Sequence, residues 1–164
     1  MGSKATAEVA QITPVLAVGA GPMGSGIAQV IAEAGIDVTL CDADAASLER
    51  GLAGVAARWE KAVATGKREA AATAKYERRL RPGDVSAARD AGLVIEAIVE
   101  RLPAKQALFA ELGQLAPPSA ILATNTSSIS VTALANASGR PAQFVGLHFF
   151  NPVPVLPLVE IVRG

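Results

Sequence analysis

The sequence predicts an α/β fold in which a doubly wound, mostly parallel sheet is covered by helices on both faces. Short apolar runs, typical of buried strands, alternate along the 164-residue chain with longer segments of helical periodicity. The first apolar run leads directly into a glycine-rich turn and then a helix, which is the order of a βα unit. Hydrophobic residues make up 51% of the chain, enough to bury the core of one domain.

The strands and helices follow from these two patterns. Buried strands are expected at the apolar and β-branched runs, which are residues 15–18, 38–41, 94–97, 121–123, 144–148 and 158–162. Helices are expected where apolar residues recur at helical spacing, which are residues 22–33, 44–65, 67–79 and 103–115. Parallel strands joined by helices require right-handed crossovers, so the expected sheet is open and doubly wound.

A helical hairpin is expected at residues 44–79, inserted after the second strand. Its first helix has Asp44 at the N-cap position and Gly66 just past its last turn. Between them, apolar residues recur at helical spacing: Leu48, Leu52, Val55 and Trp59. The charged segment 67–79 supplies the second helix of the hairpin.

Residues 1–13 are expected to form a polar tail, and residues 14–164 one domain.

Charge and composition exclude several function classes. Basic and acidic residues number 15 each, and the pI is about 6.6, so no nucleic-acid-binding surface is expected. The apolar stretch 14–36 contains five glycines and Glu33, so it is not expected to span a membrane. Cys41 is the only cysteine, which fits a reducing, cytoplasmic location.

Residues 19–24 read GAGPMG and match the pattern G-x-G-x-x-G. This pattern is weak alone, but here a strand precedes it and a helix follows it. Gly19 would make the tight turn, Gly21 would let the backbone approach a pyrophosphate, and Gly24 would pack the helix against the strand. The helix N-terminus offers free N–H groups to the phosphates. These features predict a Rossmann-type dinucleotide-binding domain.

Asp42, at the end of the second strand, completes this dinucleotide signature. A carboxylate there accepts hydrogen bonds from ribose hydroxyls and repels a 2′-phosphate, so the expected cofactor is NAD rather than NADP. The alternative is a tight βα turn in which Asp42 only caps a helix. Asp44 competes for the ribose role, although its position suits a helix cap better.

Four sequence blocks resemble the 3-hydroxyacyl-CoA dehydrogenase family. They are VGAGPMGSGIA at 18–28, EAIVERLPAKQALF at 96–109, TNTSSIS at 124–130 and HFFNPVP at 148–154. They stand in the family's order and spacing, and the resemblance covers essentially the whole chain from Pro14 onward. It implies oxidation of the 3-hydroxyl of an (S)-3-hydroxyacyl-CoA to a ketone, with hydride transfer to NAD, in fatty-acid or related acyl-CoA metabolism.

The resemblance identifies His148, the only histidine, as the general base and Glu160 as its partner. The substrate alcohol must lose a proton as its carbon loses hydride. An imidazole can take that proton, while a carboxylate fixes its tautomer and stabilises the imidazolium. A lone histidine is more often inert, so this role depends on the surrounding blocks.

The resemblance also implies several cofactor-binding residues. Ser127 would face the substrate and the nicotinamide, although it could instead cap a helix. Glu100 and Lys105 match positions near the nicotinamide ribose, against the alternative of a solvated helix face. Asn151 matches a cofactor-contacting asparagine, or is only a turn residue. Met23 would donate its backbone N–H, although its side chain could simply be part of the core.

The helical hairpin corresponds to a family insertion that helps to hold coenzyme A. Its basic residues could meet phosphates there: Arg58, Lys61, Lys67 and Arg68. The alternative, and the one favoured by composition, is a solvated helix face.

Two departures from the family pattern affect these expectations. Pro157 stands where the family commonly has lysine, which puts the geometry between His148 and Glu160 in question. Family members also continue as a helical domain, which is absent from this chain. That domain supplies much of the acyl pocket and the usual homodimer interface, so the chain alone is expected to be poorly active and to expose an apolar surface.

Two other functions remain open from the residues. The chain could be a non-catalytic NAD-binding or structural module, similar to crystallin-like relatives. It could also be another dehydrogenase of the wider β-hydroxyacid class, such as an imine or 6-phosphogluconate-type enzyme. Those enzymes usually place a lysine at the base position, whereas this chain has His148. No metal ligands are assigned.

Overall fold

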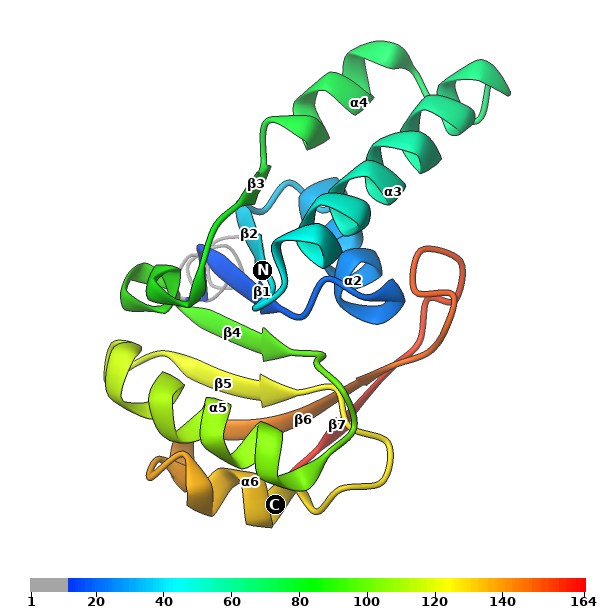
Figure 1. The fold of residues 1–164 in the computed structure, drawn as a ribbon. Coiled ribbons are helices and arrows are strands. Elements are labelled where there is room, and N and C mark those ends of the chain that lie inside the picture. The colour runs from blue at the N-terminus through cyan, green and yellow to red at the C-terminus, as the bar shows by residue number, and fades with distance from the viewer. Residues whose placement is uncertain (1–11) are drawn as a thin grey trace, which may run out of the picture.

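The computed structural model of the protein describes residues 12–164, which form one seven-stranded sheet (Figure 1). The strand order is β3-β2-β1-β4-β5-β6-β7. The strands are β1 (Val15–Val18), β2 (Val38–Cys41), β3 (Leu80–Pro82), β4 (Leu93–Glu96), β5 (Ile121–Thr124), β6 (Phe144–Phe149) and β7 (Val159–Val162). All neighbouring pairs are parallel except β6 and β7, so the predicted doubly wound, mostly parallel sheet is confirmed.

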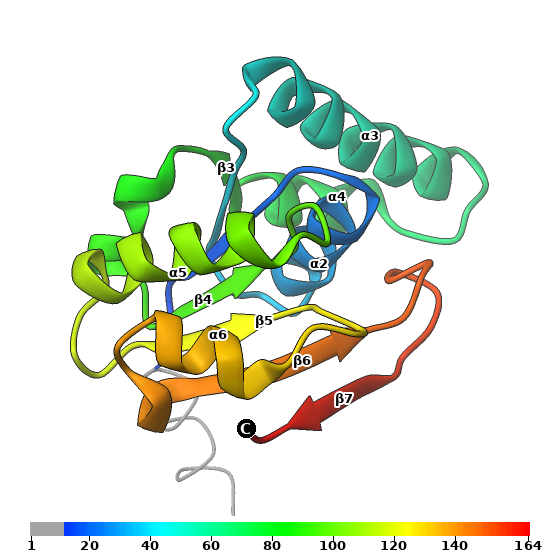
Figure 2. The same cartoon turned by 60° about the horizontal axis from the view of Figure 1, so that its bottom comes forward.

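Helices cover both faces of the sheet (Figure 2). They are α2 (Pro22–Glu33), α3 (Ala45–Ala64), α4 (Ala70–Glu77), α5 (Leu102–Leu115) and α6 (Val131–Ala137), with short 3-10 segments η1 (Val85–Asp90) and η2 (Pro141–Gln143). Helices α2, α3 and α4 lie on one side, and α5 and α6 on the other.

The alternation of side chains along β1 explains the two layers. Successive residues of a strand point to opposite faces, and all four residues of β1 are buried. Leu16 joins the core that contains Phe109 of α5, whereas Val15 joins the core that contains Ile27 of α2. A strand that is apolar at every position therefore requires helices on both sides.

Most of the expected elements lie within a few residues of their expected boundaries, and the structure also contains elements that the sequence did not predict. Strand β3, the 3-10 segment η1 and helix α6 were missed, and the helix expected at 67–79 is only α4, Ala70–Glu77. Strand β3 is a three-residue edge strand that ends in Pro82, so it lacks the apolar run that marks a central strand.

A half-buried polar cluster around Glu33 holds the hairpin of α3 and α4 against α2. Its carboxylate accepts hydrogen bonds from the Trp59 indole at 2.8 Å, the Gln29 amide at 2.9 Å and the Arg68 guanidinium at 2.5 Å. The Arg68 guanidinium also lies over the Tyr76 ring of α4. The expected cap is also present, because the Asp44 carboxylate accepts the N–H groups of residues 46 and 47 at 3.2 Å.

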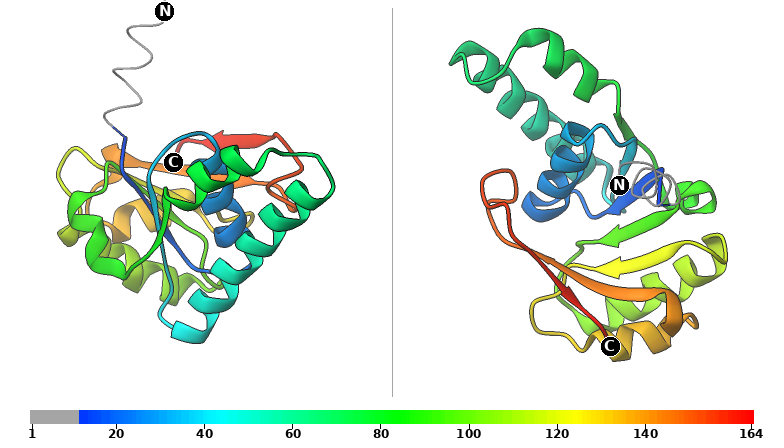
Figure 3. Two further views of the ribbon diagram at one scale, coloured as in Figure 1. Left: turned by 90° about the horizontal axis from the view of Figure 1, so that it is seen from above. Right: turned by 180° about the vertical axis from the view of Figure 1, so that it is seen from behind.

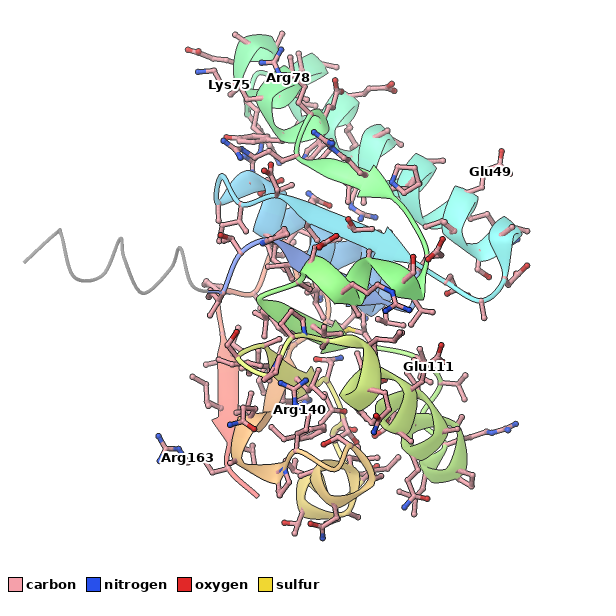
Figure 4. All side chains as sticks on the ribbon, turned by 90° about the vertical axis from the view of Figure 1, so that its left-hand side faces the viewer. Glu49, Lys75, Arg78, Glu111, Arg140 and Arg163 are labelled. Atoms are coloured by element: carbon pink, nitrogen blue, oxygen red, sulfur yellow. The ribbon has the colours of Figure 1, made fainter. Side chains whose placement is uncertain are left out.

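In the carboxyl half, Arg140 holds the connection before β5, and the β6–β7 pair forms the last part of the sheet. Arg140 donates to the backbone carbonyls of residues 116, 117, 118 and 120, at the connection between α5 and β5 (Figure 4). Strand β7 lies at the edge of the sheet beside β6, and the loop between them turns toward α2 (Figure 3). Val153 of that loop is buried and packs close to Gly26 of α2.

Only Ile12 and Thr13 of the expected polar tail are among the described residues, and they lie in neither a helix nor a strand. The rest of that prediction, residues 1–11, lies outside the described part of the chain. Among residues 12–164, no helix combines the length and apolar character that a membrane span requires.

Candidate active site

The predicted site residues gather at the carboxyl ends of the parallel strands. Strand β1 has β2 on one side and β4 on the other, so the connections leave in opposite directions at this point. In such sheets the crevice outside the carboxyl ends at this switch point is where ligands bind. The glycine loop follows β1, Asp42 follows β2, Glu100 follows β4, Ser127 follows β5, and His148 lies near the end of β6.

The three glycines of the loop meet three different steric conditions. Gly19 has φ of +103°, and a Cβ there would lie 2.5 Å from the Ala97 carbonyl oxygen. A Cβ on Gly24 would lie 1.7 Å from the Gly19 oxygen. A Cβ on Gly21 would have nothing within 4 Å. Gly19 and Gly24 are thus required by the fold itself, whereas the space at Gly21 is free for a ligand.

The N-terminus of α2 is suited to bind a pyrophosphate. Gly21 is the N-cap and supplies no side-chain cap, and Pro22 occupies the first turn. A cleft of about 390 Å³ opens beside this turn. Residues of the glycine loop and of α3 line it, including Arg50 and Arg58. The residues present therefore fit the phosphate group of a dinucleotide.

Asp42 is tied to the glycine loop by its own carboxylate. Its Oδ2 accepts the Ala20 N–H at 2.7 Å, and its Oδ1 accepts the Asp44 N–H at 2.9 Å. Each carboxylate oxygen can accept a second hydrogen bond, so capacity remains for ribose hydroxyls. The Asp44 carboxylate is engaged in capping α3, with its pKa lowered mainly by the Ser47 hydroxyl. This division of roles favours Asp42 as the ribose ligand.

Replacing Asp42 with asparagine is expected to weaken NAD binding roughly tenfold, because a neutral amide is a poorer acceptor for two hydroxyls. The same change should improve binding of NADP relative to NAD, since it removes the charge that repels the 2′-phosphate. Titration calorimetry with both cofactors measures the two effects. Asp44→Asn is the matched control and should leave the NAD-to-NADP ratio unchanged. An unchanged ratio in the Asp42 variant would contradict the assignment.

A buried ion triad lies at the carboxyl end of β4. The Lys105 ammonium is 2.6 Å from Glu96 Oε1 and 2.9 Å from Glu100 Oε2. The side chains of Lys105 and Glu96 are 1% and 0% exposed. The alternative of a solvated helix face is therefore wrong for Lys105, because its charge is enclosed and paired.

Glu100 holds the loop that carries Ser127. Its Oε1 accepts hydrogen bonds from the Thr126 hydroxyl, from the Ser127 N–H at 3.3 Å and from the Ser128 hydroxyl at 3.4 Å. Partial burial raises the pKa of the Glu100 carboxyl, but the hydrogen bonds from Thr126 and Lys105 outweigh it and hold the pKa below its ordinary value of 4.5. The carboxylate therefore stays ionised at neutral pH.

This lowered pKa predicts a pH dependence of stability. A carboxyl whose pKa is lower in the folded state stabilises the fold above its unfolded pKa of about 4.5 and loses that contribution as the pH falls through the folded value. The melting temperature should therefore decline below about pH 4.5, and the decline should be shallower in Glu100→Gln. Thermal unfolding between pH 3 and pH 7 measures the difference. Parallel curves for the two proteins would contradict the prediction.

His148 and Glu160 face each other across the antiparallel β6–β7 ladder. They are directly paired in register, and His148 Nδ1 lies 2.9 Å from Glu160 Oε2. The His148 ring also packs at 4.6 Å from the Phe150 ring. The proline at position 157 therefore does not prevent the contact, since β7 begins two residues later at Val159.

The structure also places the remaining predicted residues. Ser127 is exposed, and the cap of α6 is Ser130 rather than Ser127, so the capping alternative is wrong. Asn151 is exposed in the β6–β7 loop. Met23 is half-buried in the first turn of α2, with its side chain against the core.

The basic residues of the hairpin divide into two groups. Arg58 donates to Gln29 at 2.5 Å and lines the cleft beside the glycine loop, whereas Arg68 is paired with Glu33. Lys61 and Lys67 are exposed. A solvated face thus describes the two lysines. Arg58 lies beside the glycine loop, where it suits a phosphate of the dinucleotide, and the coenzyme A contact expected of this group stays a prediction.

Two site residues were missed in the sequence. Glu96 is the last residue of an apolar strand, where a buried carboxylate is unusual. A charged residue at that position is the sequence signal that could have identified it as a site residue. Asn125 accepts the Phe149 N–H at 2.8 Å through Oδ1 and so braces the strand end that carries His148. Cys41 is buried, and burial raises the pKa of its thiol to about 12, so it takes no part in the chemistry.

Comparison with known proteins agrees with this geometry. Residues 14–164 match the sequence model of the 3-hydroxyacyl-CoA dehydrogenase NAD binding domain. A probable 3-hydroxybutyryl-CoA dehydrogenase of Deinococcus radiodurans is 48% identical over 90% of the chain and 53% of the relative. A 3-hydroxyadipyl-CoA dehydrogenase of Escherichia coli is 47% identical over 93% of the chain and 32% of the relative. The chain thus spans about half or less of the length of these relatives.

Solved structures show the same likeness. A 3-hydroxybutyryl-CoA dehydrogenase from Escherichia coli has a TM-score of 0.88 at 46% identity, over 92% of this chain and 32% of that one. The enzyme from Ralstonia eutropha has a TM-score of 0.88 at 38% identity, over 92% of this chain and 53% of that one. These dehydrogenase names favour the enzymatic interpretation over the non-catalytic module. The chain belongs to the 3-hydroxyacyl-CoA dehydrogenase family and forms its NAD-binding domain.

Proposed function

We propose that this chain is the NAD-binding and proton-transferring part of an enzyme that oxidises the 3-hydroxyl of an (S)-3-hydroxyacyl-CoA to a ketone. The observation that carries the proposal is the His148–Glu160 pair, in which Nδ1 lies 2.9 Å from Oε2. His148 lies near the carboxyl end of β6, and the glycine loop follows the carboxyl end of β1 in the same sheet. NAD, when bound, supplies the hydride acceptor. Everything else in the reaction falls to protein side chains and to the substrate.

His148 acts as the general base through Nε2. The Glu160 carboxylate can only accept a hydrogen bond, so it selects the tautomer in which Nδ1 carries the proton. Nε2 then has a free lone pair to take the substrate hydroxyl proton as hydride leaves the adjacent carbon. The imidazolium that forms lies against the carboxylate, which stabilises its charge. The His148 side chain is 24% exposed, so a substrate can reach it.

Ser127 and Asn151 are proposed to position the reactants. Ser127 is exposed on a loop that is held by hydrogen bonds to Glu100. Its hydroxyl is therefore suited to contact the substrate or the nicotinamide. Asn151 follows the His148 strand and is exposed on the same loop whose Val153 packs against α2. Glu100 and the backbone N–H of Met23 complete the proposed cofactor-binding set, together with the three glycines and Asp42. Lys105, whose ammonium is enclosed, is proposed to support this set through its ion pair with Glu100.

Short-chain acyl-CoA esters are the proposed substrates. The named relatives are 3-hydroxybutyryl- and 3-hydroxyadipyl-CoA dehydrogenases, and the two acyl groups differ in length and in terminal charge.

The test is NADH formation from (S)-3-hydroxybutyryl-CoA and (S)-3-hydroxyadipyl-CoA, followed by the absorbance of the reduced cofactor. Because the relatives are longer, the assay is run on the chain alone and on a fusion with the remaining part of the Deinococcus radiodurans relative. Turnover by the fusion and weak turnover by the chain alone are expected. No turnover by a folded fusion that binds NAD would overturn the proposal.

A homodimer in the cytoplasm is the proposed state of the complete enzyme. The support for the dimer is the resemblance to a family whose usual homodimer interface lies in its helical domain. On this chain, Val155, Leu158 and Ile161 of β7 and of the loop before it are 69%, 54% and 71% exposed, which is the apolar surface expected where that domain packs. Such a surface is normally covered by other protein. Analytical ultracentrifugation of the fusion should give twice the monomer mass, and a monomer at micromolar concentration would contradict the dimer.

A further inference from the structure

Glu96 is fully buried, and both of its carboxylate oxygens accept hydrogen bonds from protein donors. Oε1 accepts the Ile98 N–H at 2.7 Å and the Lys105 ammonium at 2.6 Å, and Oε2 accepts the Thr124 hydroxyl at 2.7 Å. These contacts join the ends of β4 and β5 to the first turns of α5. Glu96 thus lies at the carboxyl end of β4, and its partners are Ile98, Lys105 and Thr124 rather than the exposed Ser127.

Lys105 extends this connection to the Ser127 loop. Its ammonium lies between Glu96 and Glu100, and Glu100 in turn accepts hydrogen bonds from three consecutive residues, Thr126 to Ser128. The Glu100 side chain is 38% exposed, and Lys105 is its ion-pair partner. If Lys105 turned away, Glu100 would be free to turn toward solvent, and the Ser127 loop would lose its anchor. The position of Lys105 is set by Glu96, its most buried partner.

A buried charge pair is a poor way to gain stability. Removing two charges from water is costly, and apolar residues of similar volume usually do as well or better. Glu96 and Lys105 are both enclosed, so this cost applies to both of them, whereas Glu100 is 38% exposed. What the triad does provide is directional contacts that hold a loop in one place, as rigid sites require.

We propose that Glu96 is a positioning residue, which acts through Lys105 and Glu100 to hold the Ser127 loop in the geometry that binds the cofactor. The cofactor-binding part of this proposal does not depend on the proposed reaction. Its consequence for turnover rests on the proposed function.

The experiment uses the Glu96→Gln variant and the double variant Glu96→Gln/Lys105→Met. The double variant removes both members of the most buried pair, so it leaves no unpaired ammonium to disrupt folding. Glu33→Gln is the matched control, because Glu33 is a carboxylate that is 13% exposed, has three donors and lies away from the Ser127 loop. Each protein is measured for NAD affinity by calorimetry, for melting temperature, and for amide hydrogen exchange at residues 127 and 128.

Both Glu96 variants are expected to bind NAD at least roughly tenfold more weakly and to exchange the two amides at least roughly tenfold faster. The Glu33 control should melt at a lower temperature and keep its NAD affinity. NAD affinities within about twofold of the parent in both Glu96 variants would overturn the proposal, as would an equal loss in the control. If the parent binds NAD but never oxidises a 3-hydroxyacyl-CoA, the proposed function fails while these measurements still decide the role of Glu96.

Discussion

Replacing His148 with glutamine is expected to lower the turnover number by roughly 10²- to 10⁴-fold, the usual contribution of a positioned general base. Glutamine is close in size but has no lone pair on a basic nitrogen, so the substrate hydroxyl keeps its proton. His148 is proposed to act on the substrate hydroxyl and is not among the proposed cofactor-binding residues, so the affinity for NAD should stay the same. Steady-state kinetics on the fusion protein and calorimetry with NAD measure the two quantities.

Glu160→Gln is the companion variant. An amide nitrogen can donate to His148 Nδ1 and so stabilise the opposite tautomer, in which Nε2 already carries a proton. A loss of at least roughly tenfold in turnover is expected, again without a change in NAD affinity. If His148→Gln kept full turnover, the base would lie elsewhere, and a chain that binds NAD without catalysing a reaction would be the better description.

Alanine at Gly24 and at Gly21 is expected to separate folding from cofactor binding. At Gly24 the new Cβ would lie 1.7 Å from a backbone oxygen, so α2 must move away from β1 at a cost of at least about 1–3 kcal/mol. At Gly21 the Cβ meets no protein atom within 4 Å, so the melting temperature should stay the same. The Gly21 methyl group would instead occupy the space that the pyrophosphate needs, and NAD binding should fall at least roughly tenfold.

Thermal unfolding and NAD titration of the two variants test this separation. Gly54→Ala in α3 serves as a control for the melting temperature only, because Gly54 also lines the cleft beside the glycine loop; the atom nearest to its new Cβ is the flexible end of Arg58 at 3.5 Å. It should be neutral or slightly stabilising, because alanine favours the helix. A Gly21 variant that melts early and a Gly24 variant that melts like the parent would show that the steric roles are reversed.

The elements that the sequence predicted well are those with a strong local signal. Strand β1, helix α2 and the N-cap at Asp44 depend on neighbouring residues: an apolar run, a helical period and a side chain that reaches its own backbone. Strand β3 and helix α6 are short, and tertiary contacts rather than local preference hold them in place. They were missed for that reason.

The candidate site divides in the same way. The roles of the glycine loop and of Asp42 follow from a motif whose spacing has a local steric cause, so the sequence alone identified an NAD-binding domain. The resemblance to a dehydrogenase family pointed to His148 and Glu160, but their contact depends on an antiparallel pairing twelve residues apart, which no local signal specifies. The burial of Lys105 was decided only in three dimensions, because a helix face that looks solvated in sequence is enclosed here by the ends of two strands.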